Sequence, residues 1–181
     1  TGTVGAVCET SGIDSMWRYC EGFRAGATAL DARFKTLVVY RDDGDSELLF
    51  LDEAWGYEPA KSLIKRGADV IFAAGGLTGQ GALRAAAEMN IPAIGTERDQ
   101  AAALAESGSS VVTSIFGNAS FEVQEVMRML KGKDVRQARS GQIRTVPFRG
   151  DFPENLEKEM NLLLFNLWNG NLDTNISPEK P

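Results

Sequence analysis

The sequence contains no histidine, and only two cysteines occur among its 181 residues. Histidine is the commonest general base and the commonest nitrogen ligand of metal ions, and two cysteines alone do not complete a zinc site. We therefore expect no metal site and no cofactor. Cys8 should end the first strand and Cys20 should lie in the helix after it. We expect two buried thiols there, and the alternative, a disulfide, requires an exported protein.

Long apolar segments and basic segments are missing as well. No stretch approaches the ~18 consecutive apolar residues of a membrane-spanning helix. Nineteen basic residues against twenty-five acidic ones give a net charge of -6, with no run rich in Lys or Arg. This balance disfavours nucleic acid or an anionic membrane as the main partner, because both require a cationic surface. The length and the 43% of apolar residues are sufficient for one domain with a full core or for two small lobes.

Apolar strands alternate with helices along the chain. Predicted strands cover residues 3–8, 34–41, 68–75, 91–97 and 110–116, with a further candidate at 141–149. Predicted helices cover residues 15–30 (with Asp14 as N-cap), 59–67, 79–90, 99–108, 120–133 and 152–170. Residues 46–56 fit either an inserted loop or a helical turn, and 173–181 should be a disordered tail. Five consecutive β–α units predict an α/β fold, a parallel β-sheet with helices on both faces.

The third predicted strand ends in a glycine-rich turn, GGLTGQG, at residues 75–81. Ligands of parallel α/β sheets bind at the carboxyl ends of the strands. The glycine spacing is neither that of a P-loop nor that of a dinucleotide-binding turn. Glycines nevertheless let a ligand approach the backbone, and the following helix N-terminus offers free N–H groups. The alternative is a tight turn that requires glycine and binds nothing.

Charged residues follow the fourth predicted strand: Glu97, Arg98 and Asp99. A carboxylate at a strand end accepts hydrogen bonds from ligand hydroxyls, and we expect this role for Glu97. A catalytic acid–base pair of Glu97 and Asp99 is disfavoured, because no nucleophile lies nearby in the sequence. In the alternative interpretation one of the two carboxylates caps the next helix and the other is solvated.

Aromatic residues divide into three groups. Trp17 and Phe116 lie near the predicted carboxyl edge, where they are placed to stack on a flat ring. Trp168 lies in an apolar helix and is expected in the core. Trp55 lies in the ambiguous segment and Tyr57 directly after it, and both could line a cleft, belong to a lid or contact a partner.

Three stretches together resemble the basic membrane protein (BMP, PnrA-like) family of substrate-binding lipoproteins. They are CEGFRAGATAL, RGADVIFAAGGLTGQGALRAAAEMNIPAIGTERDQ and VVTSIF. Their order and spacing are similar to the family pattern over residues 1–118 and more loosely to the end. The resemblance implies a type I periplasmic-binding-protein fold, in which two three-layer αβα lobes close around a ligand. Relatives in this family bind purine nucleosides and supply ABC importers.

The resemblance also implies a set of ligand-binding residues. The glycine turn would lie against the ligand, and the two aspartates of the family's V-D-x-D-Q motif fall on Glu97 and Asp99. Two positions depart from the family, since Gly117-Asn118 replaces a usual Lys and Glu97 replaces Asp. Arg98, beside Glu97, would suit an anionic ligand instead of a nucleoside. The predicted ligand-binding residues are Gly75, Gly76, Thr78, Gly79, Glu97, Arg98, Asp99 and Phe116.

Family members have a whole lobe before the strand with which this chain begins. We therefore expect residues 1–118 to form the second lobe of a longer receptor and residues 119–172 to pack largely on the missing N-terminal lobe. The expected partners are a small nucleoside-like ligand, that lobe, and a membrane permease or signalling protein, in an extracytoplasmic location. Two alternatives are a Rossmann-like enzyme acting on a nucleotide or sugar and a purely structural domain.

Overall fold

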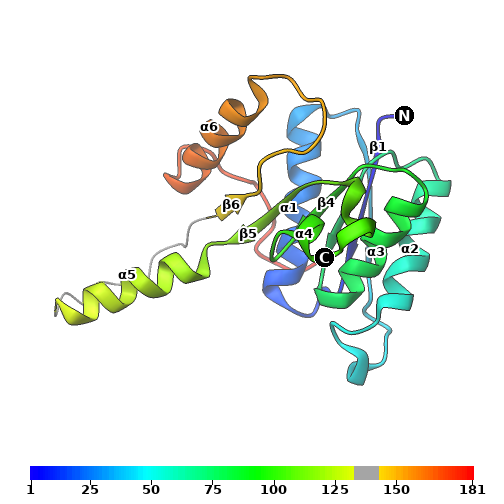
Figure 1. Cartoon of the computed structure of the whole chain (residues 1–181), viewed down its shortest axis with the longest axis horizontal. Coiled ribbons are helices and arrows are strands. Elements are labelled where there is room, and N and C mark those ends of the chain that lie inside the picture. Colours follow the sequence, from blue (N-terminus) through cyan, green and yellow to red (C-terminus); the bar gives the residue numbers. More distant parts are fainter. Residues whose placement is uncertain (133–142) are drawn as a thin grey trace.

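The computed structural model describes residues 1–132 and 143–181 and contains one six-stranded sheet (Figure 1). The strands lie in the order β2-β1-β3-β4-β5-β6. Their bounds are β1 Thr3–Cys8, β2 Lys35–Tyr40, β3 Ile71–Ala74, β4 Ala93–Thr96, β5 Val111–Gly117 and β6 Ile143–Thr145. All pairs from β1 to β5 are parallel, which confirms the predicted sheet, whereas β6 runs antiparallel to β5. Of the candidate strand at 141–149, residues 141–142 lie outside the described residues.

The helices are α1 Asp14–Leu30, α2 Glu53–Lys65, α3 Gly76–Glu88, α4 Gln100–Ala103, α5 Ala119–Lys131 and α6 Leu156–Trp168. Two short 3-10 helices, η1 Ser46–Leu48 and η2 Ala105–Ser110, complete the set among the described residues. The predicted start of α2 near residue 59 was wrong. The helix begins earlier because the side chain of Asp52 accepts a hydrogen bond from the N–H of Trp55 at 2.9 Å. The predicted N-cap of α1 was also wrong, since Ile13 occupies that position and Asp14 pairs with Arg18.

Alternate residues of the central strands point to opposite faces of the sheet, as the two-residue period of a strand requires. Val7, Ile71 and Ala73 belong to a core cluster with residues of α2 and α3. Ala6, Phe72 and Ala74 belong to a second cluster, on the α1 side. Figure 1 shows α1 on one face of the sheet and α2 and α3 on the other. This is the three-layer arrangement expected from the sequence.

Cys8 and Cys20 are joined by a disulfide, with their Cα atoms 6.4 Å apart. Both residues are fully buried. The expectation of two thiols was wrong, and the alternative of a disulfide holds. The bond fixes α1 to the carboxyl end of β1, directly before Glu9.

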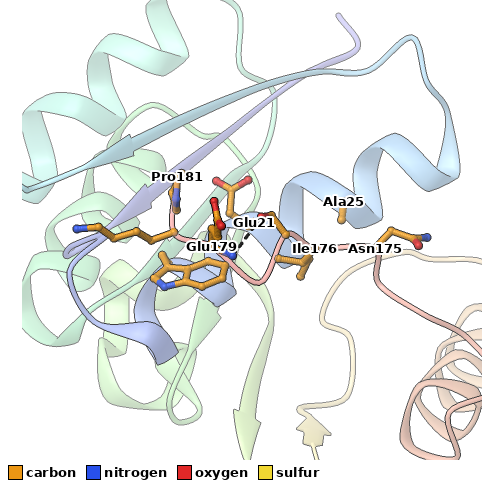
Figure 2. Close-up of a pocket in the computed structure, with 9 residues that line it drawn as sticks. Glu21, Ala25, Asn175, Ile176, Glu179 and Pro181 are labelled. Carbon is orange, nitrogen blue, oxygen red and sulfur yellow. Dashed lines mark hydrogen bonds between the residues drawn. The ribbon is translucent and has the colours of Figure 1, made fainter.

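Helices α5 and α6 lie away from the sheet, and α5 projects from the body of the molecule (Figure 1). Trp168 at the end of α6 is 49% exposed, so its expected place in the core was wrong. The tail after α6 crosses α1 and borders a pocket of about 290 Å³ with Trp17 and Glu21 (Figure 2). Trp17 itself is only 3% exposed, so it does not offer a free face for stacking on a ligand.

Candidate functional site

The carboxyl ends of β1 to β5 meet along one edge of the sheet. Cys8 pairs with Tyr40 and with Ala74, and Thr96 pairs with Ile115. The residues that directly follow these strands are therefore neighbours, as the sequence predicted from the parallel order. They are Glu9, Arg41, Gly75, Glu97 and Asn118.

The turn between β3 and α3 requires two glycines. Gly75 and Gly76 have φ angles of 122° and 58°, a region that residues with a side chain rarely adopt. A Cβ atom on Gly75 would overlap that of Glu9, and one on Gly76 would lie 2.7 Å from the carbonyl oxygen of Phe50. Gly75 is buried behind the edge, whereas Gly76 is half-buried at it.

The next part of the glycine-rich segment serves helix packing. Thr78 and Gly79 are buried within α3, and the Thr78 hydroxyl has no hydrogen-bond partner among the described residues. A Cβ atom on Gly81 would overlap the carbonyl oxygen of Glu53, and one on Gly56 would overlap that of Thr78. Close contact between α2 and α3 thus explains Gly56 and Gly81, a reason for glycine that was not considered from the sequence.

Glu97 is exposed at the edge and has a positive φ of 71°. Its N–H donates to the carbonyl oxygen of Ile115 at 3.1 Å, and its Oε2 accepts from the N–H of Gly76 at 3.1 Å. No described residue bonds to its Oε1. These contacts hold the carboxylate beside the N-terminus of α3 and leave one oxygen available.

Tyr19 in α1 is a neighbour of this carboxylate. The pKa of Tyr19 is raised first by burial and then by the negative charge of Glu97. Its ring also packs near Phe72, with ring centroids 6.4 Å apart. Sequence reasoning missed Tyr19, because nothing in the helical pattern distinguishes it from a packing residue.

The neighbours of Glu97 differ in what they contact. The Arg98 side chain is exposed and forms no ion pair within the described part of the chain. Asp99 accepts from the N–H of Ala102 at 3.1 Å and so caps α4. It also accepts two hydrogen bonds from Arg149, at 3.0 and 3.1 Å, which lower its pKa. Asp99 is therefore the carboxylate that caps the next helix, and it has Arg149 as a second partner.

Phe116 lies near the end of β5, half-buried and opposite Arg144 of β6. Of the predicted ligand-binding residues, the structure thus places Gly76, Glu97 and Arg98 side by side on the exposed edge. Gly75, Thr78 and Gly79 lie behind them, Asp99 faces Arg149, and Phe116 lies on the next strand.

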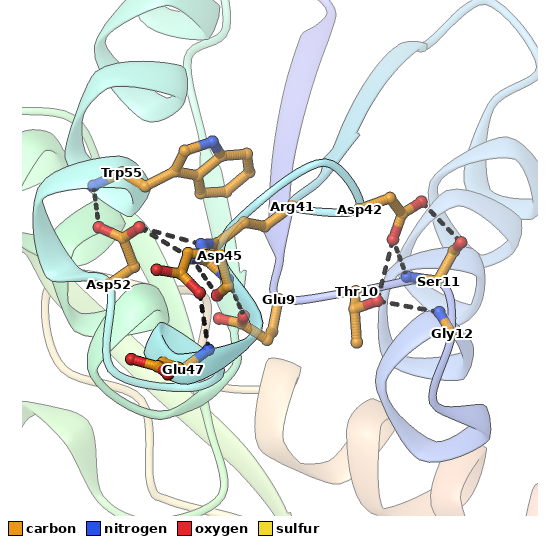
Figure 3. Close-up of polar contacts among 10 residues, drawn as sticks. All are labelled: Glu9, Thr10, Ser11, Gly12, Arg41, Asp42, Asp45, Glu47, Asp52 and Trp55. Atoms are coloured by element: carbon orange, nitrogen blue, oxygen red, sulfur yellow. Dashed lines mark hydrogen bonds and ion pairs between the residues drawn. The ribbon is translucent and has the colours of Figure 1, made fainter.

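A buried ion cluster supports the same edge, and sequence reasoning did not identify it (Figure 3). The guanidinium of Arg41 contacts Glu9 at 3.1 Å and Asp52 at 3.0 Å and donates to the carbonyl oxygen of Asp45 at 2.9 Å. The side chains of Arg41 and Glu9 are 1% and 0% exposed. The cluster holds the loop before α2 against the sheet. That loop includes Phe50, whose carbonyl oxygen accepts from the N–H of Leu77 at 2.8 Å.

Within residues 1–132 and 143–181 there is no cluster of three or more metal-ligating side chains. None of the helices in these ranges is long and apolar enough to cross a membrane.

A mostly parallel six-stranded sheet with helices on both faces is the architecture of a periplasmic-binding-protein-like lobe. The chain belongs to the PnrA-like family of ABC transporter substrate-binding proteins, whose model matches residues 1–143. The family resemblance noted from the sequence is thereby confirmed. A search of curated proteins found no match.

Solved structures support the fold. A solute-binding protein of an ABC transporter system from Conexibacter woesei DSM 14684 is similar with a TM-score of 0.71 at 22% identity, over 95% of this chain and 56% of its own. A transcriptional activator of the comK gene from Bacillus halodurans is similar with a TM-score of 0.72 at 20% sequence identity, over 95% of this chain and 58% of its own. A solute-binding protein of an ABC transporter system from Aeropyrum pernix K1 is similar with a TM-score of 0.61 at 17% sequence identity, over 98% of this chain and 47% of its own. The chain thus spans about half the length of these structures.

Proposed function

We propose that this chain is one lobe of a receptor that binds a small polar solute at the carboxyl edge of its sheet, without catalysis. The observation that carries the proposal is the position of Glu97. Its carboxylate is exposed, is oriented by the N–H of Gly76, and keeps one oxygen without a partner among the described residues. A carboxylate oxygen accepts well from ligand hydroxyls. A nucleoside is the solute that the family resemblance favours, with its sugar at Glu97.

The enzyme alternative has less support. Asp99 is engaged by Arg149 and by the N-terminus of α4, and Glu97 is hydrogen-bonded to the backbone of Gly76. A general base must be within reach of a nucleophile that it deprotonates, and neither carboxylate has one beside it among the described residues. Binding without chemistry therefore accounts better for the geometry.

A second lobe would complete the receptor. Val123, Val126, Met127 and Leu130 of α5 are all exposed, by 47 to 63%. Their spacing of three and four residues places them on one face of the helix. Leu162 and Phe165 of α6 are also exposed, by 60% and 56%. We assign this apolar surface to contact with an N-terminal lobe of the same protein, which the half-length match to solved relatives supports.

The remaining partners follow from the family. A substrate-binding protein delivers its ligand to a membrane permease. In a sensor, the signalling partner recognises the closed, ligand-bound conformation of the receptor. Both roles are extracytoplasmic. The buried disulfide between Cys8 and Cys20 supports that location, since disulfides persist in oxidising compartments.

A thermal-shift screen tests the proposed function. Nucleosides, bases, sugars and amino acids are added at millimolar concentration, because one lobe supplies only part of the contacts of a closed site. One class should raise Tm by a few degrees, and Glu97→Ala should abolish that shift. Asp43→Asn is the matched control, because it removes one exposed negative charge from the turn after β2. A ligand-induced shift that persists in Glu97→Ala would refute the assigned site.

A further inference from the structure

Four leucines are exposed beside the glycine turn, and we call them the leucine surface. They are Leu48, Leu49 and Leu51 of the loop before α2 and Leu77 in the first turn of α3, which are 43, 39, 55 and 40% exposed. The N–H of Leu51 donates to the carbonyl oxygen of Leu48 at 2.8 Å, and the N–H of Leu77 donates to that of Phe50 at 2.8 Å. These bonds join the leucines into one piece of surface. A single exposed leucine needs no explanation, whereas a connected group favours a binding surface.

The loop that carries three of these leucines is anchored to the sheet. The buried guanidinium of Arg41 contacts Glu9 at 3.1 Å and Asp52 at 3.0 Å, and it donates to the carbonyl oxygen of Asp45 at 2.9 Å (Figure 3). Phe50, between two of the leucines, has a positive φ of 64°, which residues with a side chain rarely adopt. Backbone strain of this kind is common at binding sites, and a loop that is fixed beforehand loses little entropy when a ligand binds.

The leucine surface continues into the edge that carries Glu97. The N–H of Gly76 donates to Oε2 of Glu97 at 3.1 Å, and the next residue of α3 is Leu77. On its other side Gly76 contacts the loop, since a Cβ atom there would lie 2.7 Å from the carbonyl oxygen of Phe50. A solute held at Glu97 therefore has aliphatic side chains beside it. Sites for small molecules commonly combine an apolar lining with a few polar groups that fix the orientation of the ligand.

We propose that the solute held at Glu97 carries an alkyl group that packs on the leucine surface. This inference rests on the proposed solute binding and adds a substrate class to it, an amphiphile with an uncharged head. Branched aliphatic side chains suit a flexible alkyl chain, whereas a flat ring packs best on an aromatic face. Asp45 and Glu47 are exposed on the same loop. Together with Glu97 they disfavour fatty acids and other anionic amphiphiles, because like charges repel at an interface.

Alkyl β-D-glucosides, used below their micelle concentrations, are the probes for the test. Methyl, butyl and hexyl glucoside share one uncharged head with vicinal hydroxyl groups and differ only in chain length. Binding is followed by NMR on the chain labelled with ¹³C in its leucine methyl groups. The methyl signals of the leucine surface should shift saturably, whereas those of Leu30 at the end of α1, which is 80% exposed, should not. The Kd should fall by about twofold for each added methylene, less than the roughly fourfold expected for complete burial.

Substitutions separate the alkyl group from the head. Leu51→Gln/Leu77→Gln should reduce the affinity ratio of hexyl to methyl glucoside from about thirtyfold to a few-fold. Leu30→Gln is the matched control, because it also replaces an exposed leucine, and it should keep the full dependence on chain length. Glu97→Gln should weaken all three glucosides by a similar factor, since it changes only the contact with the head. A dependence on chain length that is the same in Leu51→Gln/Leu77→Gln as in the unmodified chain would overturn the inference.

The remaining outcomes distinguish this inference from the proposed function. If polar solutes bind and longer alkyl chains add no affinity, solute binding stands and the alkyl group is refuted. If affinity rises with chain length but Glu97→Gln weakens none of the glucosides, the leucine surface stands and the placement of the head at Glu97 fails. Leucine methyl signals that move when the chain alone is diluted would show that a second copy covers this surface, and the inference would then be wrong.

Discussion

Arg149 donates two hydrogen bonds to Asp99, from Nη1 to Oδ1 at 3.1 Å and from Nη2 to Oδ2 at 3.0 Å. Arg149 ends a segment that pairs with β5, its N–H donating to the carbonyl oxygen of Val112 at 2.8 Å. Asp99 belongs to the edge that carries Glu97. The ion pair therefore connects the α/β lobe with the segment that leads out towards α6.

This pair should contribute stability that depends on pH. Because Arg149 lowers the pKa of Asp99, the contribution is full above about pH 4, the ordinary carboxyl pKa, and is lost as the pH falls through the lowered value. Asp99→Asn keeps a capping acceptor for α4 but removes the charge. We expect it to cost at most about 1 kcal/mol at pH 7, because the pair is partly exposed, and progressively less as the pH falls towards 2.

Urea unfolding of both proteins between pH 7 and pH 2 measures this difference. Asp99→Ala, which also removes the cap, should cost roughly 1 kcal/mol more than Asp99→Asn at every pH. A constant gap between Asp99→Asn and the unmodified chain over the whole range would show that the ion pair does not titrate as described.

Two glycines in helices should respond in opposite ways to alanine. Gly81→Ala places a methyl group onto the carbonyl oxygen of Glu53, so α2 and α3 must separate. We expect a loss of roughly 1–3 kcal/mol in the free energy of unfolding. Gly26 lies in the interior of α1 with no atom within 4 Å of the Cβ position. Gly26→Ala should stabilise the protein by roughly 0.5–1 kcal/mol, because alanine is the better helix former.

Chemical denaturation of the two variants measures both changes in the free energy of unfolding, the expected loss for Gly81→Ala and the expected gain for Gly26→Ala. The pair is internally controlled, since each variant adds one methyl group within a helix. A neutral Gly81→Ala would mean that the two helices are not in close contact at this point.

Much of the fold was predictable because local patterns determine it. Apolar runs between glycines and polar turns placed β1 to β5 to within a few residues, and their alternation with helices implied the parallel order. The start of α2 was missed although Asp52 is a residue type that favours N-caps, because the apolar SELLFL stretch before it suggested no boundary.

The site was only partly predictable because its contacts join distant segments. Glu97 was expected at the edge because it follows a strand. Its hydrogen bond from the N–H of Gly76 could not be predicted, because the positive φ of residue 97 is unusual for a glutamate. The Glu9–Arg41 pair depends on β1 and β2 being neighbours. Trp168 was expected in the core because its helix is apolar, whereas the side chain is 49% exposed at the end of α6.

Arg41 and Glu9 form a buried pair whose two halves depend on each other. Arg41→Met would leave the fully buried Glu9 carboxylate without its cation. We expect a loss of roughly 3–5 kcal/mol, the usual cost of breaking a buried pair from one side. The double variant Arg41→Met/Glu9→Gln should recover a large part of this loss, since the fully buried charge of Glu9 is gone and the Asp52 carboxylate, 19% exposed, keeps its hydrogen bond from the N–H of Trp55. A double-mutant cycle in urea measures the coupling, and additive effects of the two substitutions would contradict it.

The disulfide of Cys8 and Cys20 should stabilise the lobe without being required for its fold. The chain separation of 12 residues corresponds to roughly 3 kcal/mol of loop-closure entropy. Helix α1 also packs on the sheet through Phe23, whose ring stacks on Phe72 with centroids 4.9 Å apart. Cys8→Ala/Cys20→Ala should therefore lower the free energy of unfolding by about that amount while retaining native circular dichroism. Each single variant should lose as much stability as the double variant, because either one breaks the bond. Single variants that remain as stable as the unmodified chain would show that the cysteines are not bonded in the folded protein.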